Sequence, residues 1–173
     1  MNRRTVRRTL LALPLSIALS LPLAACGSDE PAGSAGSAVE EVAAEVSTDL
    51  GVRPEVPASD APAPTELVVE DVVVGDGAEA TGGTTAEVKY VGGFYESGEE
   101  FDASWDRGEE ETLPVTLGAG QVIPGFEQGI EGMQVGGRRV VTIPSELGYG
   151  DQARGPIPAG STLVFVLDLV SVD

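Results

Sequence analysis

The most informative stretch of the sequence covers residues 121–129 and reads QVIPGFEQG. A proline has its φ preset near the helical value and lacks an N–H, so Pro124 predicts a short helix that begins there. Phe126 is then expected to point inward, with an apolar neighbour one turn later. Backbone N–H groups just before a helix have no intrahelical partner, so Val122 and Ile123 could offer a donor to a ligand carbonyl. The pattern is suited to binding an amide.

Groups for covalent or metal chemistry are scarce in this sequence. It contains no histidine and one cysteine, Cys26, which argues against a zinc site and against a histidine-assisted nucleophile. The acidic residues at 96–100 lack the spacing of a calcium loop. Residues 118–123 begin like a dinucleotide fingerprint but have Ile123 where the third glycine belongs. We therefore expect neither a metal nor a cofactor.

Alternating apolar residues predict the elements that must position this stretch. The expected strands cover residues 67–74, 85–92, a short piece from Phe101, 113–117, 138–144 and 162–170. Between these strands, the helix at Pro124 is the one expected. The sequence therefore predicts an α+β fold, an antiparallel sheet with one packed face and one solvent-exposed face, wrapped on one short helix.

Four aromatic side chains from different elements fall on inward-facing positions: Tyr90, Phe101, Phe126 and Phe165. The pattern alone allows two interpretations. Either the rings simply fill the core, which the pattern by itself favours, or they line a cavity between the sheet and the helix.

Three further motifs accompany QVIPGFEQG: VKYVGGFYESGEEFDAS upstream, and IPSELGYGD and GSTLVFVLDLV downstream. Together the four motifs strongly resemble the FKBP family of peptidyl-prolyl cis–trans isomerases, in family order and with near-family spacing. The resemblance covers roughly residues 67–173. It implies an FKBP-like isomerase domain at residues 66–173 and favours the cavity interpretation.

The resemblance also implies a role for each pocket residue. Phe126 would form the floor under a proline ring, and Ile123 and Tyr149 would offer a backbone N–H and a hydroxyl to the substrate. The implied catalytic set is Tyr90, Phe101, Asp102, Ile123, Phe126, Tyr149 and Phe165. The implied substrate-binding set is Arg107, Leu113, Gln121, Val122 and Ile157. Without the resemblance, Asp102 and Arg107 would be interpreted as solvated surface charges.

Three positions depart from the best-known members of the family. Phe126 replaces a tryptophan at the floor, Leu113 stands where an aromatic wall is usual, and Gln121 replaces an acidic residue that contacts macrolide ligands. These changes leave isomerisation of X-Pro bonds as the expected activity, with a macrolide as a further ligand of unspecified affinity. The alternative is a proline-peptide binding module or chaperone with little turnover.

The first 25 residues have the pattern of a signal peptide: four arginines, then an uncharged apolar run over residues 10–25. The run ends LAAC, which resembles the lipobox of bacterial lipoproteins, so Cys26 is expected to be lipidated and to become the new N-terminus. An ordinary secretory signal with a chance cysteine is one alternative. An uncleaved membrane span is disfavoured because Pro14 and Pro22 interrupt the run. The sequence leaves Sec and Tat export open.

Residues 26–65 are predicted to be a flexible linker, because they are rich in Gly, Ser, Ala, Pro and acidic residues and contain no aromatic side chain. Apolar residues at helical spacing over 38–50 leave a short helix open. The formal net charge is −18, and cleavage before Cys26 would remove four arginines and leave −22. This charge argues against nucleic-acid binding. We expect a monomer that is lipid-anchored on the extracytoplasmic face of the cell membrane and acts on proline-containing exported polypeptides.

Overall fold

The structure is a computed structural model and describes residues 42–173. The predicted signal peptide and Cys26 lie outside the described residues. The strands are β1 (Val68–Val73), β2 (Thr85–Phe94), β3 (Glu100–Ala103), β4 (Leu113–Thr116), β5 (Arg138–Ile143) and β6 (Leu163–Val172). The helices are α2 (Pro124–Ile130) and two short 3-10 helices, η1 (Ser104–Arg107) and η2 (Ser145–Leu147). Within residues 42–173, none of the helices is long and apolar enough to cross a bilayer.

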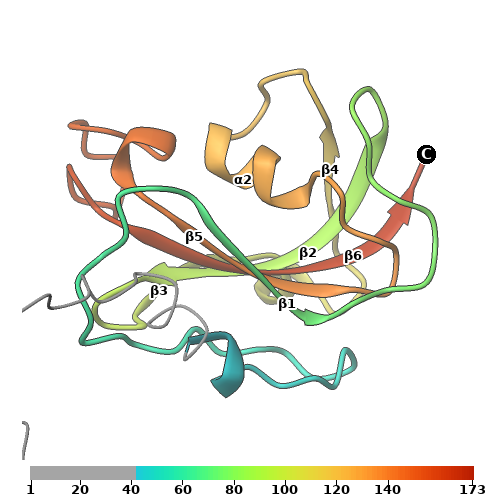
Figure 1. Cartoon of the computed structure of the whole chain (residues 1–173), viewed down its shortest axis with the longest axis horizontal. Coiled ribbons are helices and arrows are strands. Elements are labelled where there is room, and N and C mark those ends of the chain that lie inside the picture. The colour runs from blue at the N-terminus through green and yellow to red at the C-terminus, as the bar shows by residue number, and fades with distance from the viewer. Residues whose placement is uncertain (1–41) are drawn as a thin grey trace, which may run out of the picture. The chain divides into compact units, whose positions relative to one another are not determined.

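The six strands form one antiparallel sheet in the order β1-β5-β6-β2-β3, and β4 also pairs with β2 (Figure 1). The long strands β2 and β6 pair at the centre, with Tyr90 opposite Leu167. The predicted strands are confirmed, with bounds that differ by a few residues at most. The α+β class with a short helix against the sheet is also confirmed.

Helix α2 lies close against β5 because two glycines face the sheet. A Cβ on Gly129 would lie 2.7 Å from Cγ2 of Val141, and a Cβ on Gly125 would collide with Ile143. Phe126 and Ile130 on the same side of the helix are buried in the core. Glycine at both positions therefore sets how near Phe126 comes to the sheet.

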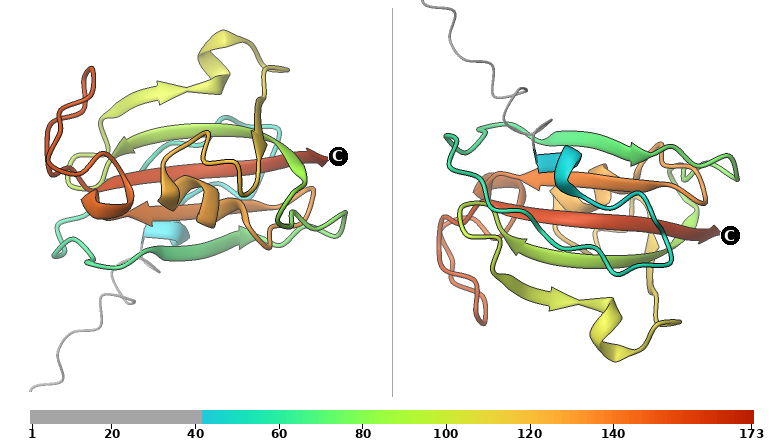
Figure 2. Two further views of the ribbon diagram at one scale, coloured as in Figure 1. Left: turned by 90° about the horizontal axis from the view of Figure 1, so that it is seen from above. Right: turned by 90° about the horizontal axis from the view of Figure 1, so that it is seen from below.

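The opposite face of the sheet is also covered, which the sequence analysis did not expect. Val91, Val164 and Val166 face away from α2 and are fully buried. Residues 42–61, which we call the N-terminal strap, run across this face (Figure 2). The expectation of one solvent-exposed face is therefore wrong, because the strap brings its own valines to that face.

Within the strap, residues 42–45 form one helical turn, inside the stretch 38–50 where a helix was left open. Val42, Val46 and Val56 are buried against the sheet. The linker predicted at 26–65 thus differs from the structure over the strap, where three valines pack on the sheet while Val52 stays half exposed. Residues 26–41 lie outside the described part.

A buried arginine holds the strap to the sheet. The Arg138 guanidinium is fully buried and forms a bidentate pair with Asp168, at 2.6 and 2.7 Å. Its remaining N–H groups donate to the backbone carbonyls of Ser47, Asp49 and Val52. All donors of this side chain are therefore used, and three of its five hydrogen bonds end on the strap.

Candidate active site

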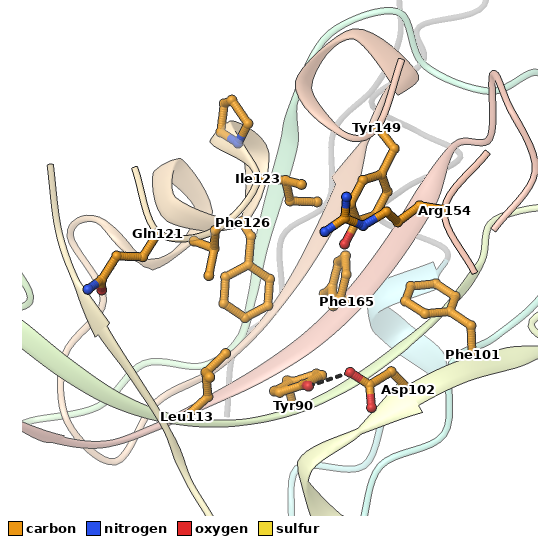
Figure 3. Close-up of a pocket in the computed structure, with 12 residues that line it drawn as sticks. Tyr90, Phe101, Asp102, Leu113, Gln121, Ile123, Phe126, Tyr149, Arg154 and Phe165 are labelled. Atoms are coloured by element: carbon orange, nitrogen blue, oxygen red, sulfur yellow. Dashed lines mark hydrogen bonds between the residues drawn. The ribbon is translucent and has the colours of Figure 1, made fainter. Parts of the chain in front are cut away.

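A cavity of about 520 Å³ opens on the α2 side of the sheet. Figure 3 shows the side chains around it, which come from β2, β3, β4, β6, α2 and the loops that precede α2 and β6. Its lining consists of Tyr90, Phe101, Asp102, Leu113, Gln121, Val122, Ile123, Pro124, Phe126, Tyr149, Arg154 and Phe165.

Aromatic rings form the apolar part of the cavity. Phe126 and Phe165 meet edge to face with centroids 5.0 Å apart, and Tyr90 meets Phe126 in the same way at 5.7 Å. Phe101 packs on Phe165 at 5.6 Å from the other side. Such pairs are favourable and hold each ring in a defined orientation. The four rings therefore make a fixed apolar surface rather than a loosely filled core.

Gly92 on β2 makes this ring arrangement possible. A Cβ at this position would lie 2.6 Å from Phe165 and 2.9 Å from Phe101. The sheet also shifts register between Gly92 and Gly93, where β3 pairs with β2. The sequence alone does not single out Gly92, because a glycine inside a strand indicates a close approach of other atoms without indicating which atoms.

The polar side of the cavity is a network of three side chains. The Tyr90 hydroxyl donates to Oδ2 of Asp102 at 2.5 Å, and Arg107 donates to Oδ1 of Asp102 at 3.2 Å and to the Tyr90 oxygen at 3.0 Å. Burial of the phenol raises the pKa of Tyr90 above its usual value, and the hydrogen bond to the Asp102 carboxylate raises it further, against the opposing effect of Arg107. Tyr90 therefore stays protonated and keeps donating to Asp102.

Ser104 fixes the backbone beneath this network. Its buried hydroxyl accepts the Tyr90 N–H at 2.9 Å and lies 3.4 Å from the Tyr90 carbonyl, to which it can donate. The strap acts from the outside: Arg53 pairs with Glu100 at 2.6 Å and with Asp106 at 3.1 Å. Glu100 directly precedes Phe101 and Asp102, and Asp106 directly precedes Arg107.

The loop before α2 presents a free backbone donor. Ile123 is the N-cap residue, and its carbonyl accepts the N–H groups of Phe126 and Glu127 at 3.0 and 3.2 Å. Within residues 42–173, the Ile123 N–H itself has no hydrogen-bond acceptor. The Glu127 carboxylate accepts the N–H groups of Gly118 and Gly120, and Gln121 accepts that of Thr116. The loop is therefore braced while its last donor remains available.

Tyr149 approaches the cavity from the loop that follows η2. Figure 3 shows its hydroxyl directed into the cavity. Among the described residues this hydroxyl has no hydrogen-bond partner, so it can donate to a ligand carbonyl. Together with Ile123, it gives the cavity two separate donors above an aromatic floor.

The structure brings most of the predicted site residues together in one lining. Arg107 lies behind it, in contact with Asp102 and Tyr90. Ile157 is buried in the core beside the cavity and does not line it. The lining adds Pro124 and Arg154, which the sequence analysis did not select. The sequence pattern marks Pro124 only as a helix start, and Arg154 lies in a loop without a periodic pattern.

The described residues of this site supply apolar contacts and hydrogen-bond donors. Among residues 42–173, no group of three or more His, Cys, Asp or Glu side chains is arranged to hold a metal ion. The cavity instead offers an aromatic surface for a saturated ring and donors for amide carbonyls. A pocket of this kind is suited to bind an apolar ring together with the amide groups next to it.

Comparison with known proteins identifies the family. A model of the FKBP-type peptidyl-prolyl cis-trans isomerase family matches residues 77–170. The chain belongs to this family and is an enzyme of the FKBP-type peptidyl-prolyl cis–trans isomerase class.

Relatives extend the match beyond the family model. The chain is 48% identical over 119 residues to a probable FK506-binding protein of Corynebacterium glutamicum, which covers 69% of this chain and 98% of the relative. It is 50% identical over 122 residues to an FK506-binding protein of Streptomyces anulatus, covering 69% of this chain and 97% of the relative.

Solved structures show the same fold. AtFKBP13 superposes with a TM-score of 0.57 at 36% identity, covering 64% of this chain and 96% of that one. FkpA from Escherichia coli superposes with a TM-score of 0.56 at 38% identity, covering 63% of this chain and 49% of FkpA.

Proposed function

We propose that this protein isomerises X-Pro bonds of exported polypeptides by favouring the twisted form of the amide. The observation that carries the proposal is the fixed aromatic cavity, with the free N–H of Ile123 at one side and the Asp102 network at the other. A proline ring would rest on Phe126, and the chain on either side of it would meet the two polar regions.

The mechanism follows from the electronic structure of the amide. Planarity gives the C–N bond partial double-bond character and a rotation barrier of about 18–20 kcal/mol. Rotation removes this resonance, so the twisted amide is less polar than the planar one. An apolar cavity stabilises the twisted state relative to the planar ground state, and this difference alone accelerates rotation.

Fixed polar groups add to this effect. Asp102 is half exposed at the cavity, and its charge is balanced by Arg107 and by the Tyr90 hydroxyl. A carboxylate held in place by Arg107 and Tyr90 can interact with the carbonyl carbon as it rotates. The Ile123 N–H anchors a second carbonyl, so that one side of the X-Pro bond is held while the other turns.

Two substitutions test the proposal. Phe101→Ala removes one aromatic wall. Asp102→Val replaces the carboxylate with an apolar side chain of similar size. We expect each to lower the isomerisation rate at least about tenfold with thermal unfolding still cooperative. Glu96→Ala, an exposed change in the loop between β2 and β3, serves as the control. Unchanged rates in both cavity variants would remove the basis for assigning activity to this cavity.

We also propose that the protein acts on the extracytoplasmic face of the cell membrane, attached through lipid on Cys26. The support is the sequence pattern at residues 1–26 and the formal charge of −18, which offers no electrostatic attraction to anionic lipid. Lipid chains would then be the source of membrane affinity.

The same cavity is the proposed site for a macrolide. The relatives from C. glutamicum and S. anulatus are named as FK506-binding proteins. FK506 would compete with proline peptides for the aromatic surface, so it should inhibit isomerisation, and a higher peptide concentration should relieve the inhibition. Inhibition that peptide does not relieve would place the macrolide elsewhere.

A further inference from the structure

One cation at the cavity has no partner. Residues 42–173 contain six basic residues. Four of them, Arg53, Arg107, Arg138 and Arg139, form ion pairs with carboxylates, and the Lys89 ammonium lies 4.7 Å from the centroid of the Trp105 ring. In the described part of the chain, Arg154 alone makes neither an ion pair nor a stacking contact. The sequence has 28 acidic residues, so the lack of a carboxylate beside Arg154 is informative.

The backbone of Arg154 is nevertheless fixed. Its N–H donates to the Ile157 carbonyl at 2.8 Å, and the Ile157 N–H donates back to the Arg154 carbonyl at 2.9 Å. Gly155, with φ of +56°, closes the tight turn between them. Ile157 is 5% exposed and anchors the turn in the core. The base of the Arg154 side chain is therefore held in place while its head stays in solvent.

Figure 3 shows the Arg154 side chain extending from this turn toward the cavity, in the same region as Tyr149. Asp102 is the other charged residue of the lining, and Arg107 pairs with it at 3.2 Å. One positive charge at the cavity is thus unbalanced, although the chain as a whole is strongly negative. Because the Debye length is about 8 Å at physiological ionic strength, charges farther than this from a bound substrate act on it much less than Arg154 does.

We propose that Arg154 is a specificity-determining residue that favours substrates with an acidic side chain next to the proline. The proposal deepens the proposed isomerase function and rests on it. With the proline ring on the aromatic floor, the residues directly before and after the proline would lie against the lining to which Arg154 belongs. No carboxylate among the described residues pairs with Arg154, so the substrate carboxylate would be its ion-pair partner.

The test compares peptides that differ only in charge. NMR exchange rates are measured with the full-length protein for Glu-Pro against Gln-Pro peptides and for Pro-Glu against Pro-Gln peptides. We expect the wild-type protein to act about threefold faster on the acidic member of at least one pair, as exposed ion pairs provide. High salt should reduce this ratio. In Arg154→Gln the ratio should fall to about one.

Lys89→Gln is the matched control, since it removes the same charge from β2 but away from the cavity lining. It should keep the wild-type ratio. A ratio near one in the wild-type protein, or an equal ratio in wild type and Arg154→Gln, would overturn the assignment. If the Gln peptides bind but do not exchange faster, the isomerase proposal fails. The role of Arg154 is then decided by comparing the binding affinities of the Glu and Gln peptides.

Discussion

Gly92 is the residue on which the geometry of the cavity depends most directly. A methyl group at this position would lie 2.6 Å from Phe165 and 2.9 Å from Phe101, so both rings would have to move. We expect Gly92→Ala to lower the isomerisation rate by at least about tenfold, because a ring displacement of this size disturbs the reacting geometry. Stability should fall by about 1–3 kcal/mol, as overpacking does.

Gly82→Ala is the control for that experiment. A Cβ at Gly82 would meet no atom within 4 Å, so the same chemical change should leave both rate and stability close to wild type. Equal rates for Gly92→Ala and the wild-type protein would show that the Phe101 and Phe165 positions do not limit catalysis.

The raised pKa of Tyr90 predicts a pH dependence of stability. Because this pKa lies above 10.0 in the folded state, the folded protein holds the phenolic proton more tightly than the unfolded chain does. The resulting stabilisation is complete below about pH 10 and is lost as the pH rises toward the folded-state pKa. Denaturant unfolding at a series of alkaline pH values should show this loss. In Tyr90→Phe the part of this loss that comes from the phenol should be absent. If the free energy of unfolding falls with pH equally steeply in both proteins, Tyr90 is not the group responsible.

The site was largely predictable at the level of residue types. Tyr90, Phe126 and Phe165 could be placed because their strands and helix have clear periodicity, and the resemblance to a family turned inward rings into a cavity. Arg154 could not be placed in this way, because it lies in a turn whose shape depends on a pair of backbone hydrogen bonds to Ile157. Ile157 was assigned to the cavity but is taken up by the core.

Among the elements, the strap is the one whose role the sequence analysis missed. Its valines are few and spread among Gly, Pro and acidic residues, so composition alone predicts a linker. The complementary signal was in the strands, where Val91, Val164 and Val166 are apolar on the face expected to be wet. An antiparallel sheet with apolar residues on both faces needs a second covering layer.

Arg138 gives the strap a measurable energetic signature. Arg138→Ala would leave Asp168 buried without its partner and three strap carbonyls without their donor. We expect a loss of about 3–5 kcal/mol in the free energy of unfolding, measured by denaturant titration. Arg53→Ala, which breaks a partly exposed pair of the same strap, should cost less than about 1 kcal/mol.

The same reasoning applies to removal of the whole strap. A fragment of residues 66–173 would expose Val91, Val164 and Val166 and should be much less stable than a fragment of residues 42–173. Equal free energies of unfolding for the two fragments would mean that the strap lies on the sheet without stabilising it. Equal values for Arg138→Ala and Arg53→Ala would mean the same.

For the molecule as a whole, the strap changes the length of chain between the proposed anchor and the enzyme. Cys26 and the first strap residue, Val42, are separated by 15 residues, a stretch that spans at most roughly 58 Å when fully extended. A flexible linker over residues 26–65 would instead give a connection of about 40 residues. The cavity is therefore expected to work nearer the membrane surface than a linker of that length would allow.

Lipidation is tested at this scale by Cys26→Ala. If lipid on this residue provides the membrane affinity, the cleaved variant should move from the membrane fraction to the soluble fraction. Without the four signal-peptide arginines the formal charge falls from −18 to −22, so there is no compensating attraction to anionic lipid. Fractionation followed by mass spectrometry checks both location and signal-peptide cleavage. A cleaved variant that remains in the membrane fraction would count against the anchor.

Catalysis of cis–trans exchange in a short X-Pro peptide, followed by NMR with catalytic amounts of the full-length protein, tests the proposed mechanism most directly. We predict faster exchange with the wild-type protein and a large loss of that acceleration in Phe101→Ala. Peptide binding without faster exchange would contradict catalysis at this cavity and would indicate a module that holds proline-containing segments.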